Sequence, residues 1–446
     1  MEKPDLATQR REYCRMVNME NNPSATRVRY SILAAVFVNV VINYMDRSNI
    51  SVAGPLISKE FNLDSIKTGY VFSAFGLTYA CFQIPGGILA DRVGVKLLYC
   101  ITLVIWSVAT IFLGFAVGFI SLLILRIVIG AFEAPSYPMN NRIVTSWFPE
   151  NERASAIAMY TSGQFIGLAF LTPLLTYIQI RTSWRGLFYI TGILGVLWGI
   201  TWYFFYKSPT ESKAINKLEL DYIEKGGGIV NRKKDEEENV GFTWENLGIV
   251  MSKRKLWGIY IGQFCLGGTL LFFLTWFPKY LIDYRKMDFI KSGFYASIPF
   301  LCAFGGVLFS GFMSDYLVKK KLSPGFARKA PIVAGLILSA SIVGANYVTD
   351  PNWVILFMSL AFFGNGLASI TWVFVSLLAP KKLLGLTGGV FNFIGNLASI
   401  FVPIIIGYLV KNGDFSPALV FIGCLTLIGA LSYILLVGKI ERIPIN

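Results

Sequence analysis

Four charged residues stand inside long apolar stretches of this chain: Asp46, Arg47, Arg126 and Glu133. An ionised side chain costs roughly 2.5–3.5 kcal/mol at the centre of a membrane-spanning helix, so charges at such positions usually mark function. The alternative is two internal ion pairs that only fasten helices together. Apolar packing can replace a purely structural pair at little cost, and we therefore favour a functional role for all four.

The spacing of these residues suggests separate tasks. Adjacent Asp46 and Arg47 point about 100° apart on a helix, and Arg126 and Glu133 share a face about 10.5 Å apart along the axis. Between them, Gly130 is expected to clear room for a side chain from another helix. A guanidinium matches a carboxylate, so Arg47 is the predicted anchor for an anionic substrate. Burial disfavours an ionised carboxyl group, so Asp46 and Glu133 are predicted to carry protons, with Arg126 stabilising one ionised carboxylate.

The composition requires a membrane around these residues. Of 446 residues, 54% are hydrophobic and only 15% are charged, whereas soluble chains carry about 25% charged residues. Histidine is absent, which excludes Ser-His-Asp catalysis and histidine metal ligands. The six cysteines form no C-x-x-C pair, and no phosphate-binding loop of the G-x-x-x-x-G-K-[ST] type occurs. We predict no enzyme, no metal site and no cofactor.

Twelve apolar segments are long enough to cross a bilayer, which needs about 20 residues each. The predicted fold is an all-α membrane protein of two six-helix bundles. The first bundle covers 30–206, between a tail at 1–29 and a linker at 207–255, and the second covers 256–438 before a tail at 439–446. The linker is expected to hold one short surface helix at 211–224, and Pro135 and Pro138 are expected to kink their helix near Glu133. The expected spans are 30–57, 66–90, 96–116, 118–142, 154–178, 185–206, 256–281, 290–314, 330–348, 352–378, 383–410 and 416–438.

Positive charge is distributed unevenly between the two sides of these spans. With the amino terminus inside, the inner segments hold 29 of the 40 lysines and arginines and the outer loops hold nine. Because inner loops carry the excess of Lys and Arg, both termini are predicted to face the cytoplasm of a bacterial inner membrane. The net charge of +14 is thereby explained by topology, and no nucleic-acid partner is expected.

The two halves repeat each other at a shift of 224 residues. Gly69 aligns with Gly293, Gly87 with Gly311 and Asp91 with Asp315. A second echo pairs Q-F-I-G at 164–167 with N-F-I-G at 392–395. Related six-helix halves form pseudo-symmetric bundles with a site at their interface.

Three motifs resemble the major facilitator superfamily and its anion:cation symporter branch. They are G-G-I-L-A-D-R-V-G-V-K at 86–96, N-Y-M-D-R-S-N at 43–49 and R-I-V-I-G-A-F-E-A-P-S-Y-P at 126–138. Further stretches, such as Y-T-S-G-Q-F-I-G-L-A-F-L-T-P-L-L and F-F-G-N-G-L-A-S-I-T-W, closely resemble bacterial D-galactonate/proton symporters, over about residues 29–438. The resemblance implies a monomeric importer of a sugar-acid anion with protons, most closely D-galactonate.

The same resemblance implies the site residues. Asp46 and Glu133 would carry protons, Arg126 would tune them, and Arg47 would anchor the carboxylate. Neutral polar groups and aromatic faces would contact the hydroxylated chain, since the second half offers no ionisable residue in mid-span. Asn365 and Asn396 are further neutral polar groups there, and Asn396 departs from the galactonate pattern, which has a small residue. The implied sugar contacts are Tyr44, Tyr79, Gln164, Gln263, Ser369, Thr371, Trp372 and Asn392.

Asp91 and Arg92 suggest a cytoplasmic gate. An aspartate that meets a helix N-terminus of the opposite half is favoured by the helix dipole. The second copy keeps Asp315 but has Tyr316 in place of the arginine, so its latch should be weaker. Two alternatives share the fold: a hexuronate or glucarate/aldarate symporter, and an organophosphate/phosphate exchanger. The exchanger would need two converging cations, and the second half supplies none.

Overall fold

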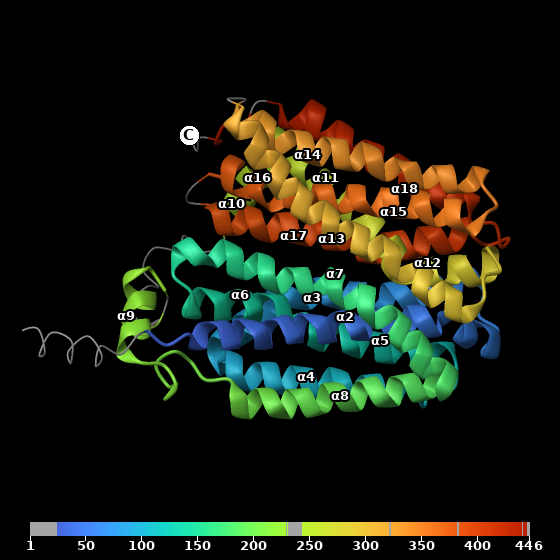
Figure 1. Cartoon of the computed structure of the whole chain (residues 1–446), viewed down its shortest axis with the longest axis horizontal. Coiled ribbons are helices and arrows are strands. Elements are labelled where there is room, and N and C mark those ends of the chain that lie inside the picture. Colours follow the sequence, from blue (N-terminus) through green and yellow to red (C-terminus); the bar gives the residue numbers. More distant parts are fainter. Residues whose placement is uncertain are drawn as a thin grey trace, which may run out of the picture.

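The computed structural model describes residues 25–228, 230, 243–320, 323–380, 383–438 and 440–443, and these form helices with no strand among them. Figure 1 shows two helical bundles side by side, blue to green for the first half and yellow to red for the second. Both described chain ends and α9 lie at one end of the bundles (Figure 1). We call this end the terminal face and the opposite end the far face.

The first bundle holds seven helices. They are α2 (Val28–Glu60), α3 (Ser65–Val93), α4 (Val95–Leu113), α5 (Phe119–Glu133), α6 (Ser136–Trp147), α7 (Glu150–Arg181) and α8 (Trp184–Phe205). In the second bundle, short 3₁₀-helical and π-helical segments (labelled η) interrupt several spans. Its elements are α11 (Arg254–Leu271), η3 (Phe272–Trp276), α12 (Phe277–Lys279), η4 (Tyr280–Tyr284), α13 (Phe289–Lys319), α14 (Pro324–Ser339), η5 (Ala340–Tyr347), α15 (Pro351–Leu367), η6 (Ala368–Thr371), α16 (Trp372–Leu378), α17 (Leu384–Leu409), α18 (Ser416–Leu431) and η8 (Ser432–Val437).

The fold class predicted from the sequence is confirmed. Within the described chain, 11 helical stretches are long and apolar enough to cross a membrane. The predicted span at 66–90, which is not among these 11, corresponds to α3, a 29-residue helix packed against α5 and α17. The chain is therefore a multi-pass membrane protein.

Proline shapes the helices that carry the predicted site. The span predicted at 118–142 is two helices, because α5 ends at Glu133 and α6 begins at Ser136, with Pro135 between them. In the second bundle, η6 interrupts the span formed by α15 and α16. Both irregularities fall beside predicted site residues, where a freed backbone can be satisfied only if it is buried in protein or lines water.

Small residues at repeat-related positions let the two bundles touch. A Cβ on Gly69 of α3 would lie 2.7 Å from the Pro403 oxygen of α17, and one on Gly293 of α13 would lie 2.7 Å from Thr176 Oγ1 of α7. Two glycines that align in the sequence thus sit at two equivalent crossings between bundles. Ser73 adds a hydrogen bond from its Oγ to the Ile400 oxygen at 2.7 Å.

The described part of the linker contains α9 (Lys217–Lys225) at the position of the predicted helix and a further helix, α10 (Trp244–Ser252). Moreover, α9 is not a simple surface helix, because Glu219 is fully buried. Its carboxylate accepts hydrogen bonds from Thr26 Oγ1 at 2.7 Å and from the Val28 amide at 3.0 Å, and pairs with Arg29 Nη1 at 3.0 Å. Arg29 also pairs with Glu152 at 3.1 Å. Glu219 therefore caps the start of α2 from another element.

Candidate functional site

An ion pair at the centre of the site joins α2 to the end of α5. Arg47 Nε on α2 lies 2.6 Å from Glu133 Oε1 at the end of α5. Glu133 is fully buried, and Asn43 Nδ2 donates to the same oxygen at 3.3 Å. Arg47 Nη2 and Glu133 Oε2 are both buried without a hydrogen-bond partner in the described part of the chain. A guanidinium with a spare N–H beside a paired carboxylate is prepared for a second anion.

Asp46 faces away from this pair. Its Oδ2 accepts from Trp106 Nε1 at 3.0 Å and its Oδ1 from Asn49 Nδ2 at 3.3 Å. Asn49 also donates to Thr191 Oγ1 at 2.8 Å. Because neighbouring helix residues diverge by about 100°, one carboxyl group can be held behind the site while Arg47 faces into it.

Arg126 is buried against an aromatic ring of α3. Its guanidinium carbon lies 4.7 Å from the centre of the Phe75 ring, and its Nε is buried without a hydrogen-bond partner among the described residues. The expectation for Gly130 is confirmed, because a side chain of another helix fills the space beside it. A Cβ there would meet the Phe75 carbonyl oxygen and Thr78 Oγ1, so the glycine admits the backbone of α3 as well as a side chain. This close approach positions Phe75 against both arginines.

Aromatic rings surround the Arg47 guanidinium. Its carbon lies 4.5 Å from the Tyr79 ring centre, 4.9 Å from that of Tyr44 and 5.0 Å from that of Phe75. The Tyr44 hydroxyl donates to Gln164 Oε1 at 2.8 Å. The structure therefore gathers all four predicted ligands of the first half, since Arg47, Tyr44, Tyr79 and Gln164 form one connected group. Cation–π contacts stabilise the arginine and leave its Nη2 without a hydrogen-bond partner among the described residues.

The second half contributes neutral groups that are already hydrogen-bonded. Thr371 Oγ1 donates to Gln263 Oε1 at 2.8 Å. Asn392 Nδ2 donates at 2.8 Å to Oε1 of Gln83, which belongs to α3 of the other bundle. Asn396 Nδ2 donates to the Asn392 backbone oxygen at 2.9 Å. The residue that departs from the galactonate pattern thus contacts a predicted ligand only through its backbone.

Two further predicted contacts differ in exposure. Trp372 is 51% exposed and packs edge-on against Phe391, with ring centres 4.9 Å apart. Ser369 is half-buried in η6, one turn before it. Asn365, by contrast, is buried and donates to the Leu266 oxygen at 2.9 Å. This hydrogen bond joins α15 to α11.

The predicted gate falls largely outside what the structure describes. The side chains of Asp91 and Asp315 lie outside the described part of the chain. Arg92 is exposed in the last turn of α3, at the terminal face.

The site residues that the sequence reasoning missed include Gln83, Trp106 and Phe75. Gln83 could have been predicted from the sequence, because a glutamine within a membrane span needs a hydrogen-bond partner. Trp106 and Phe75 could not, since aromatic residues are ordinary members of apolar helices. Only the packing of α3 and α4 against α2 and α5 shows what their rings contact.

This geometry, a buried ionic cluster in one of two repeat-related helical bundles, is that of a secondary transporter. The family described as the Major Facilitator Superfamily matches residues 36–403. The chain belongs to this superfamily of transporters and is not an enzyme.

Curated transporters of sugar acids are similar to this chain over nearly its whole length. The chain is 52% identical to a D-galactonate transporter of Escherichia coli O6:H1, over 94% of this chain and 97% of that one. It is 43% identical to a probable galactarate/D-glucarate transporter of Bacillus subtilis, over 94% of each chain.

Solved structures share the fold. A bacterial homologue of the human lysosomal transporter Spinster, in an inward-facing and occupied conformation, has a TM-score of 0.72 at 18% identity, over 91% of this chain and 96% of that one. A D-xylose-proton symporter has a TM-score of 0.70 at 16% identity, over 92% and 98%.

Proposed function

We propose that this protein imports a sugar-acid anion, most closely D-galactonate, together with protons across a bacterial inner membrane. The observation that carries the proposal is the Arg47–Glu133 pair at 2.6 Å with an unpartnered Arg47 Nη2. Protonation of Glu133 would release Arg47 to a substrate carboxylate, so that loading the proton and loading the anion favour each other. The name of the 52% identical relative supports D-galactonate.

The second half argues for a substrate with one charge. Its predicted ligands, Gln263, Thr371 and Asn392, are neutral, and hydroxyl groups of a sugar chain can replace their present hydrogen bonds. Galactarate or glucarate carries a second carboxylate, and phosphate carries up to two charges. A hexuronate carries one carboxylate and differs from a galactonate by its aldehyde or ring. A dianion would call for a second cation at this end, so D-galactonate is preferred over the aldarates of the 43% identical relative.

The far-face crossings at Gly69 and Gly293 support a state closed on that side. With the Lys/Arg-rich terminal face placed in the cytoplasm, this is an inward-facing state. The two bundles would rock about the central site to open the far face. In that motion the Ser73 and Gln83 bonds between bundles would break or change partners.

Uptake into proteoliposomes tests the proposal. Labelled D-galactonate should accumulate when the external side is acid, and unlabelled D-galactonate should compete better than hexuronates, aldarates or phosphate. Arg47→Lys should reduce uptake about 10–100-fold, because it loses the planar fork that hydrogen-bonds the carboxylate. Arg185→Lys is the matched control, since Arg185 forms an ion pair of 2.7 Å with Glu60 and neither residue belongs to the site. Full uptake by Arg47→Lys, or equal competition by phosphate, would overturn the assignment.

A further inference from the structure

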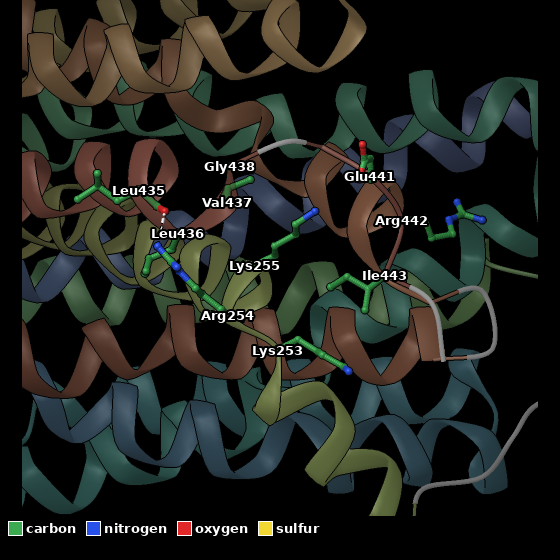
Figure 2. Close-up of a pocket in the computed structure, with 10 residues that line it drawn as sticks. All are labelled: Lys253, Arg254, Lys255, Leu435, Leu436, Val437, Gly438, Glu441, Arg442 and Ile443. Atoms are coloured by element: carbon green, nitrogen blue, oxygen red, sulfur yellow. Dashed lines mark hydrogen bonds between the residues drawn. The ribbon is translucent and has the colours of Figure 1, made fainter. Parts of the chain in front are cut away.

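A cavity lies at the terminal face, in the second bundle. It has a volume of about 510 Å³ and is formed by the start of α11, the end of η8 and the tail that follows (Figure 2). The tail is held in place by a hydrogen bond from the Ile443 amide to the Leu378 oxygen at 3.0 Å. None of the residues that line this cavity belongs to the transport site.

Positive charge dominates the lining. Four of its ten residues are basic, namely Lys253, Arg254, Lys255 and Arg442, and only Glu441 is acidic. Arg254 is engaged, because its Nη2 donates to the Leu435 oxygen at 2.9 Å. Figure 2 shows Lys255 extending toward the tail segment that carries Gly438 and Glu441. Neither the Lys253 nor the Lys255 ammonium group has a hydrogen-bond or ion-pair partner within the described residues.

The start of α11 adds to this positive field. Lys253 is the residue before the helix, and its side chain forms no cap. The first amide groups of a helix have no intrahelical acceptor, and the helix dipole places partial positive charge at this end. The two lysine ammonium groups and this helix end therefore favour the same kind of ligand, an anion.

The neighbouring surface is apolar. Leu435, which lines the cavity, is 61% exposed, and Leu431 and Ile434 before it on the same helical segment are 51% and 46% exposed. Trp257 is 37% exposed and donates from Nε1 to the Met251 oxygen at 2.7 Å, as aromatic residues do at a membrane interface. The cavity thus lies where lipid-facing helix surface meets polar chain.

We propose that this cavity binds the phosphate headgroup of an anionic phospholipid, with Lys253 and Lys255 as its cationic contacts. The adjoining leucines would lie along the acyl chains, which a free phosphate compound could not use. Basic pockets beside membrane-spanning helices hold anionic headgroups in this way. Bound there, a lipid would bridge the first and last spans of the second bundle.

Native mass spectrometry of the full chain, with phosphatidylglycerol titrated in, tests the proposal. The variant Lys253→Gln/Lys255→Gln should bind this lipid about 25-fold more weakly, at about fivefold for each lysine. Lys253→Arg/Lys255→Arg should retain binding. The matched control Lys291→Gln/Lys411→Gln removes the same charge from exposed positions at the far face and should leave binding unchanged.

The outcomes separate the alternatives. Equal lipid retention by the Gln pair and the wild type overturns the site. An equal loss in the far-face control overturns it as well, because net charge alone would then explain binding. A third arm offers glycerol 3-phosphate at the same concentration: if it displaces phosphatidylglycerol equally well, the ligand is a soluble phosphate compound and the lipid assignment is wrong.

Discussion

Replacing Glu133 with glutamine isolates the proposed coupling step. The change keeps the size of the side chain but removes the charge that holds Arg47 at 2.6 Å. In the wild type, an ionised Glu133 competes with substrate for Arg47, and a protonated Glu133 does not. Substrate affinity should therefore fall as pH rises. In Glu133→Gln the competitor is absent at every pH, so affinity should stay near the acid value of the wild type.

The size of the effect follows from the contact. A hydrogen bond to a charged group contributes about 1.5–3 kcal/mol, and 1.4 kcal/mol corresponds to tenfold in affinity. The wild type should thus bind D-galactonate about 10–150-fold more weakly in mildly alkaline than in mildly acidic buffer. Because Glu133 is fully buried, water cannot screen this competition as it would at a surface.

Two assays on the same preparation measure the consequence. Equilibrium dialysis with labelled D-galactonate across this pH range gives the affinities. Counterflow in proteoliposomes preloaded with unlabelled D-galactonate needs no proton gradient, so the variant should retain exchange while it loses gradient-driven accumulation. Glu60→Gln is the matched control, because Glu60 pairs with Arg185 outside the site; it should behave as the wild type.

Two results would refute the reasoning. If Glu133→Gln keeps the pH dependence of the wild type, then another group controls Arg47. If it accumulates substrate against a gradient as the wild type does, then Glu133 carries no coupled proton.

Three further predictions concern packing and contacts between elements. Gly130→Ala should destabilise the protein by about 1–3 kcal/mol, because the added carbon meets the backbone of α3; an unchanged Tm would show that the helices separate freely. Glu219→Ala should cost about 3 kcal/mol, because it removes the cap of α2 and the buried partner of Arg29, which keeps only the pair with Glu152. The measurement is Tm, which should fall, and a Tm within error of wild type would mean that the capping contact contributes nothing. Gln83→Ala should tighten D-galactonate binding about fivefold, since it frees the Asn392 amide at the cost of one hydrogen bond of about 1 kcal/mol; weaker binding in dialysis would instead make Gln83 a ligand.

The sequence by itself determined the helical membrane fold, its two repeated halves and the four charges that stand within spans. These features are properties of the linear chain. The length of an apolar stretch decides whether it can cross a bilayer, and a charge within such a stretch is costly wherever its helix later packs. Gly69 and Gly293 could also be aligned from the sequence, because each lies where helices of the two bundles come too close for a larger side chain.

Only the tertiary structure decided which groups meet. Arg47 pairs with Glu133 while its neighbour Asp46 is held by Trp106, and Asn392 reaches Gln83 of the opposite bundle. The rotation and depth of each helix select such partners, and these depend on close packing summed over many apolar side chains that carry no individual signal. The capping of α2 by Glu219 has the same origin, because about 190 residues separate groups that only folding brings within hydrogen-bonding distance.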